Sequence, residues 1–182
     1  MAGKGWSLRL RVTKFRLDSA NLRDSVHPNI FTKNNPMTTK PIPEGYHTVT
    51  PYLIVDGAQK LIDFLKQAFD AKETFCMRGA GEKVMHAEVV IGDSTIMIAD
   101  LTPQWQARSS MIYLYVEDVD VVYKRAVQAG ATSVKEPENQ FYGDRSAGVT
   151  DAVGNYWGIA TRVEDVSPEE IAKRAEAFAK QS

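Results

Sequence analysis

From residue 51 on, one pattern of apolar and polar residues occurs twice, at an offset of about 60 positions. Each copy opens with a short apolar run rich in strand-forming residues, Tyr52–Val55 and Ile112–Val116. An acidic turn follows, in which Asp56 and Asp118 are suited to cap the next helix. Apolar residues then recur at helical spacing, at Leu61, Leu65 and Ala68 in the first copy and Val122, Ala126 and Ala129 in the second.

Three strand-like segments follow each expected helix. In the first copy they are ETFCMRG, KVMHAEVVIGD and STIMIADL, separated by glycine-containing turns. In the second copy TSVKEPEN, RSAGVTDAVGN and NYWGIATRV take the same places with a weaker pattern. The repeat therefore predicts a β-α-β-β-β unit used twice. Because one such unit leaves a sheet face and a helix face uncovered, two units must pack together.

We expect an α+β fold of two tandem β-α-β-β-β modules, 46–102 and 109–166, whose curled mixed sheets surround a cleft. Such a cleft is the usual place for a ligand. A C-terminal helix is predicted over 167–182, because Ser167, Pro168 and Glu170 form a helix start with a capping box. Residues 1–40 form a basic segment without sustained periodicity, predicted to be a disordered arm; Met37 is an alternative natural start.

Composition narrows the range of partners. The net charge is −1, which gives no reason to expect nucleic acid as a partner, and no apolar run is long enough to span a membrane. The single cysteine, Cys76, cannot form an internal disulfide. This is typical of a protein of the reducing cytoplasm, where we expect the chain to work.

The segments TPYLIVDGAQKLIDFLKQAF, VMHAEVVIGDSTIMIAD, YLYVEDVDVVYKRAVQAGA and FYGDRSAGVTDAVGNYWGIAT resemble the vicinal oxygen chelate superfamily. This superfamily includes glyoxalases, fosfomycin-modifying enzymes, extradiol dioxygenases and bleomycin-resistance proteins. The resemblance is greatest to its PhnB-like branch and covers about residues 46–166. It implies the doubled-module fold and, often, a homodimer, but one fold hosts many chemistries.

The resemblance also implies where a divalent metal would bind. In the superfamily's metalloenzymes, His, Gln or Glu side chains on equivalent strands hold the ion. Those positions fall on Thr50, His86 and Gly158 in this chain. Only His86 is a good ligand, because the metals concerned prefer imidazole and carboxylate.

Other residues are candidates to complete such a site. His86 and Glu88 are two apart on an expected strand, so both side chains point to the same face, where they could bind Zn, Mn, Ni or Fe. His47 lies just before the first strand and is a further candidate. Alternatively, His86 and Glu88 pair with each other or with Arg145.

A metal-free cleft would bind its ligand through other side chains. Arg145 offers a planar fork for an anionic group, or else braces its loop by pairing with Asp144. The turn from Asp151 to Asn155 is interpreted as structural, and Trp157 as a core residue. The full set of predicted ligand-binding residues is Arg145, Tyr142, Phe141, Trp105, Thr50 and Glu88, with Trp105 in the linker between modules.

Two functions of different classes follow. The first is a protein that binds a small molecule in the cleft between modules, without the usual metal triad and without a cofactor. The second is a divalent-metal-dependent lyase, isomerase, transferase or dioxygenase with a rearranged site around His86 and Glu88. In either case we expect a homodimer that binds neither nucleic acid nor membrane.

Overall fold

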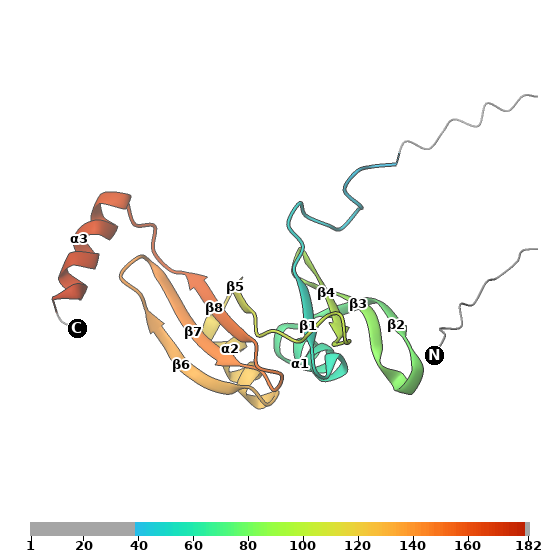
Figure 1. Cartoon of the computed structure of the whole chain (residues 1–182). Helices are drawn as coiled ribbons and strands as arrows, with labels where there is room; N and C mark the ends of the chain where they lie inside the picture. The colour runs from blue at the N-terminus through green and yellow to red at the C-terminus, as the bar shows by residue number, and fades with distance from the viewer. Residues whose placement is uncertain (1–38, 181–182) are drawn as a thin grey trace, which may run out of the picture. The chain divides into compact units, whose positions relative to one another are not determined.

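A computed structural model of the chain describes residues 39–180. The predicted arm, residues 1–40, lies outside them except for its last two residues. The described chain confirms the predicted pair of β-α-β-β-β modules followed by a helix (Figure 1). The first module contains β1 (Tyr52–Val55), α1 (Ala58–Phe69), β2 (Lys72–Arg78), the short 3-10 helix η1 (Ala80–Glu82), β3 (Val84–Ile91) and β4 (Ser94–Asp100). The second contains β5 (Met111–Tyr115), α2 (Val119–Gln128), β6 (Thr132–Asn139), β7 (Asp144–Thr150) and β8 (Tyr156–Arg162), and α3 (Pro168–Ala179) follows it.

Each module forms its own four-stranded mixed sheet. The strand order is β1-β4-β3-β2 in the first sheet and β5-β8-β7-β6 in the second. β1 runs parallel to β4 and β5 parallel to β8, while the other neighbours are antiparallel. Each sheet therefore has two edge strands. We call β1 and β5, the first strand of each module, the inner edges, and β2 and β6 the outer edges.

The two outer edges are irregular. β2 pairs with β3 through two register shifts, and β6 pairs with β7 through two more. β6 also contains Pro137, which has no N–H to donate to a further strand. Such features discourage another chain from adding to a sheet edge.

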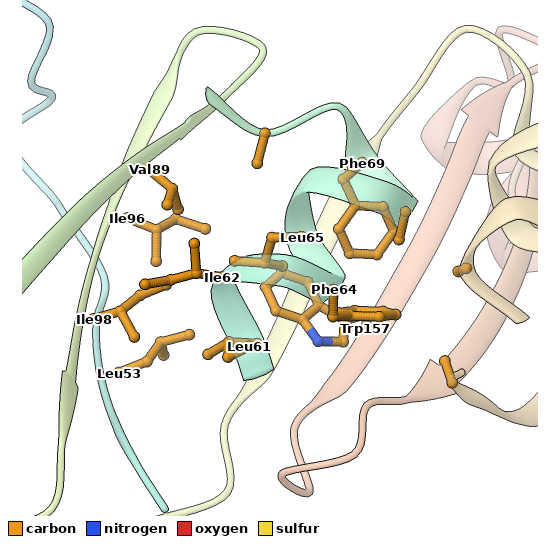
Figure 2. Packing of buried hydrophobic residues seen from close by; sticks show 14 of the residues in the cluster. Leu53, Leu61, Ile62, Phe64, Leu65, Phe69, Val89, Ile96, Ile98 and Trp157 are labelled. Atoms are coloured by element: carbon orange, nitrogen blue, oxygen red, sulfur yellow. The ribbon is translucent and has the colours of Figure 1, made fainter. Parts of the chain in front are cut away.

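One helix covers one face of each sheet. α1 presents Leu61, Ile62 and Leu65, all fully buried, to the strands of its module. Leu53 of β1 and Ile98 of β4 meet them from the sheet, as Figure 2 shows. We call the opposite face of each sheet its open face, because it carries many of the exposed large side chains.

The two modules pack together through their helices and not through shared strands. The fully buried indole of Trp157, on β8, lies beside two rings of α1, at 5.2 Å from Phe69 and 6.5 Å from Phe64 between centroids (Figure 2). Arg125 of α2 donates from Nε to the carbonyl of Ala68, 2.7 Å away, at the end of α1. These contacts confirm Trp157 as a core residue.

Side-chain caps fix where the helices begin. Asp118 accepts from Val121 N at 3.1 Å, which confirms it as the cap of α2. The prediction for Asp56 is wrong, because Gly57, with φ 102°, takes the capping position of α1. The carboxylate of Asp100 replaces a local cap: Oδ1 accepts from Ala58 N at 2.8 Å and from Gly57 N at 3.1 Å. Its Oδ2 accepts from Val84 N at 2.8 Å, tying β3 to the same point.

The turn before β8 is organised by the buried carboxylate of Asp151. Its Oδ1 accepts from the backbone N–H groups of Val153 and Asn155, and its Oδ2 accepts from Trp157 Nε1 at 2.9 Å. This confirms the structural interpretation of the turn.

The C-terminal helix starts as predicted. Ser167 caps it by accepting from Glu170 N at 3.3 Å, and Pro168 is its first residue. Among the helices of residues 39–180, none combines the length and the apolar character needed to cross a membrane.

Candidate functional site

A connected row of polar side chains lies on the open face of the first sheet. Tyr52 Oη is 3.0 Å from His86 Nδ1, and His86 Nε2 is 3.2 Å from Glu88 Oε1. Tyr46, which lies before β1, hydrogen-bonds to the other end of the row at Glu88. The contact between His86 and Glu88 confirms that their side chains share a face, and that they pair with each other.

The hydrogen bond between Tyr46 and Glu88 dominates the electrostatics of this row. It raises the pKa of Tyr46 to about 12, with burial and the Glu88 charge adding to the effect. The same bond, and to a smaller extent the contact with His86, lowers the pKa of Glu88 against the opposing effect of burial. Glu88 is therefore an anion at neutral pH.

Apolar side chains frame the imidazole of His86. The ring of Tyr52 meets it edge-on with 5.5 Å between centroids, and the ring of Phe75 lies 6.0 Å away. In the sheet register Met77 of β2 is opposite His86, and Phe75 is opposite Glu88. The open face is thus an apolar, partly aromatic surface crossed by one line of hydrogen-bonding groups.

The metal positions implied by the resemblance do not form a ligand set here. The Thr50 hydroxyl donates to the carbonyl of His47 in its own loop, at 3.1 Å. Gly158 lies under the ring of Tyr113: a Cβ atom at 158 would be 2.9 Å from Tyr113 Cε2 and closer still to Cδ2. Both ring nitrogens of His86 have partners within the row. Within residues 39–180, no group of three or more His, Cys, Asp or Glu side chains could hold a metal ion.

The open face of the second sheet is lined by tyrosines. Tyr115 Oη donates to Asp144 Oδ2 at 2.9 Å, and the rings of Tyr113 and Tyr115 meet edge-on. Burial raises the pKa of Tyr113 to about 12, with smaller contributions from Tyr142 and Asp144. The Asp144 carboxylate is buried, and the guanidinium of Arg162 lies 3.6 Å from its Oδ1.

Three of the predicted ligand-binding residues lie around this second sheet. Arg145 points to the helix side of β7, where Nε and Nη2 bind the Asp120 carboxylate of α2 at 2.7 and 2.8 Å. Its fork is occupied by Asp120, not by the predicted local partner Asp144. Phe141 and Tyr142 are half-buried and meet edge-on, with 5.2 Å between centroids. Phe141 also contacts Phe178 of α3, which directs it toward the helix.

Trp105 lines a cavity of about 500 Å³ next to the polar row. It belongs to the linker after β4 and is 68% exposed. Tyr52 connects the two features, because its ring lines the cavity while its hydroxyl contacts His86. Sequence reasoning missed Tyr52, Tyr46 and Tyr113. Strand alternation could have placed Tyr52 and Tyr113 on the open faces.

A second cavity, of about 990 Å³, lies between the modules. Its lining comes from the β3–β4 turn, β5 and the pair Asp70–Arg125. None of the predicted site residues lines this cavity. The predicted site residues are thus divided between the open face of the first sheet and the surroundings of the second.

Comparisons with known proteins agree with this architecture. The family model described as "Glyoxalase/Bleomycin resistance protein/Dioxygenase superfamily" matches residues 46–159. The uncharacterized protein Rv0887c of Mycobacterium tuberculosis is 38% identical over 134 residues, which cover 68% of this chain and 79% of the relative. The uncharacterized protein Mb0911c of Mycobacterium bovis is equally similar, with 88% of its length covered.

Solved structures show the same fold. TioX from a Micromonospora species has a TM-score of 0.53 at 21% identity, over 63% of this chain and 96% of TioX. A member of the glyoxalase/bleomycin resistance protein/dioxygenase superfamily from Sphaerobacter thermophilus has a TM-score of 0.51 at 22% identity, over 63% of this chain and 96% of its own. At this level of identity the likeness concerns the fold alone.

Proposed function

Because this chain belongs to the glyoxalase/bleomycin resistance protein/dioxygenase superfamily, we propose that it binds an organic small molecule on its open sheet faces without a catalytic metal. The observation that carries the proposal is the ring of Tyr113 over Gly158. It fills the space that a ligating side chain on β8 would need. What remains on the open faces is apolar surface with a few hydrogen-bonding groups, which is typical of sites for organic ligands.

The state of the polar row supports the same proposal. A metal ligand at His86 would need a free ring nitrogen, yet Tyr52 and Glu88 engage both. Replacing these contacts by a metal would also separate Glu88 from the partner that helps to lower its pKa. The row instead holds the ring of Tyr52 in a fixed orientation at the cavity beside it.

We further propose that two copies of the chain together complete the cleft. The open faces carry exposed apolar side chains at Tyr52, Phe75 and Met77 on the first sheet and at Met111 and Tyr115 on the second. No further strand of residues 39–180 pairs with the outward side of β5, while the linker runs beside the outward side of β1, where Arg108 N donates to the carbonyl of Ile54 at 3.2 Å. A homodimer that brings the first sheet of one copy against the second sheet of its partner would cover both.

Two finer assignments belong with this proposal. We propose that the chain belongs to the PhnB-like branch, and the resemblance of the segments TPYLIV and VEDVSPEEIAKRAEA supports this. The single cysteine among 182 residues requires no oxidising compartment, so we place the protein in the cytoplasm.

A ligand screen with and without metal tests the proposal. The full chain is treated with a chelator and screened against small aromatic and anionic molecules by calorimetry, then screened again with added zinc, manganese, nickel or iron. We expect binding in the presence of chelator, with an affinity that added metal leaves unchanged. Binding that appears only with metal, and is lost in His86→Ala and Glu88→Ala, would instead establish the metal-dependent enzyme.

A further inference from the structure

We propose that the cavity beside Trp105 binds a planar aromatic ring that carries a carboxylate or a similar anionic group. This inference rests on the proposed function and specifies the ligand class of one of its sites. The cavity volume, about 500 Å³, lies within the range of about 300–1,000 Å³ common for small-molecule sites.

The lining of the cavity favours a flat aromatic ligand. Trp105 and Tyr52 supply two aromatic walls, and Ile54, Met85 and Leu101 supply aliphatic ones. The Tyr52 ring is oriented by its contact with His86. A thioether and two aromatic rings are the groups that pack best against the face and edge of another ring.

The backbone of Trp105 is held in place by its own turn. Thr102 Oγ1 accepts from Trp105 N at 3.0 Å, and Thr102 N donates to the Trp105 carbonyl at 2.8 Å. The turn therefore fixes the backbone of a residue that is 68% exposed. A large apolar surface kept in the open at a cavity is typical of a binding site.

The charges at the cavity favour an anion. Two charged residues line it, Asp100 and Lys83. Asp100 already accepts three backbone N–H groups at the start of α1 and β3. The Lys83 ammonium has no hydrogen-bond or ion-pair partner among residues 39–180. The acceptors of Asp100 are thus engaged within the fold, while the Lys83 ammonium is left to pair with a ligand carboxylate beside the aromatic walls.

Calorimetry with three probes tests this inference on the full chain. The probes are naphthoate, its neutral analogue naphthamide, and cyclohexanecarboxylate, an anion without an aromatic ring. We expect naphthoate to bind most tightly, because it alone satisfies both features of the cavity. Trp105→Leu is expected to weaken naphthoate binding about tenfold, the fold-change of one lost aromatic contact.

Lys83→Met should weaken naphthoate binding about fivefold at low ionic strength and leave naphthamide unchanged, because it removes only the charge pair. Added salt should narrow the gap between wild type and Lys83→Met, since it screens that pair. Lys72→Met is the matched control, because Lys72 is exposed on β2 of the same sheet but does not line the cavity. Circular dichroism verifies that each variant is folded.

The outcomes separate this inference from the proposed function. The inference is overturned if naphthoate and naphthamide bind with equal affinity, or if neither Trp105→Leu nor Lys83→Met changes the affinity for naphthoate. Either result leaves metal-independent binding elsewhere on the open faces standing. The inference is also overturned if none of the three probes binds. The wider screen with and without metal then decides the proposed function by itself.

Discussion

Gly158 and Tyr113 fit one another on the open face of the second sheet, since the ring lies where a side chain at 158 would begin. We expect Gly158→Ala to lower the free energy of unfolding by about 2 kcal/mol, because the added methyl group overpacks the contact. Urea denaturation of the single variants and of the double variant with Tyr113→Ala measures this. In the Tyr113→Ala background, Gly158→Ala should be neutral or slightly stabilising, since alanine is favoured over glycine in a strand. If Gly158→Ala lowered the free energy of unfolding equally in both backgrounds, the contact between position 158 and the Tyr113 ring would not be the cause.

Single residues also show the limit of sequence reasoning. Strand alternation is sufficient to place His86 and Glu88 on one face, and the order of turn residues is sufficient to interpret Asp151. The partner of Arg145 could not be predicted, because Asp120 is 25 positions away and reaches it only through the packing of α2 on β7. The role of Asp100 was missed for the same reason, since its acceptors serve two segments distant in the chain.

α3 depends on charge for its attachment. Arg174 binds Glu164 through both terminal nitrogens at 2.8 Å and Glu170 through Nε at 3.0 Å. Contact with Arg174 lowers the pKa of Glu164 and of Glu170. A lowered carboxyl pKa means that the attachment is complete above the ordinary glutamate value, about 4.3, and is lost as the pH falls through the lowered values. None of the residues of α3 is buried, so apolar packing, such as the contact of Phe178 with Phe141, retains it less than the ion pairs do.

We therefore expect α3 to detach below about pH 4 while the two modules remain folded. NMR signals of the Ala172 and Ala175 amides, followed from pH 7 downward, report the change. Arg174→Gln should show the detached signals already at neutral pH. Signals of α3 that stay unchanged in Arg174→Gln would mean that the ion pairs do not hold the helix.

Helices and strands were predictable where the hydrophobic period was strong. Both β-α-β-β-β units follow from it, while local capping residues predict the start of α3 and the cap at Asp118. The start of α1 could not be predicted, because a glycine with positive φ and a carboxylate from β4 replace the local capping signal. A pattern confined to neighbouring residues cannot report an acceptor supplied by a distant strand.

At the scale of the whole molecule, the sequence repeat predicts two modules. It does not predict whether their sheets join within one chain or between chains. The single chain has two separate sheets joined through helices. If two copies join at the inner edges, light scattering should give about twice the chain mass of 20.3 kDa. Met111→Lys, on β5, should give the mass of one chain, because a charge replaces a side chain that is 73% exposed on that edge.

Val134→Lys is the matched control for this experiment. Val134 is also exposed, at 58%, but it lies on the outer edge strand β6. We expect this variant to keep the mass of two chains. A wild-type protein of single-chain mass at all concentrations would rule out the homodimer.

The irregular outer edges decide what kind of assembly such a molecule can form. A chain whose sheet edges pair head to tail without closing would add copies without end and grow into fibres. In the part of the chain that the structure describes, the register shifts of β2, together with those of β6 and its Pro137, leave β1 and β5 as the regular edges, with one carbonyl of β1, that of Ile54, already accepting from Arg108 N. When two copies use these edges on each other, no receptive edge is left over. The same features that interrupt hydrogen bonding at the periphery would therefore terminate growth at two subunits and protect a crowded cell from polymerisation.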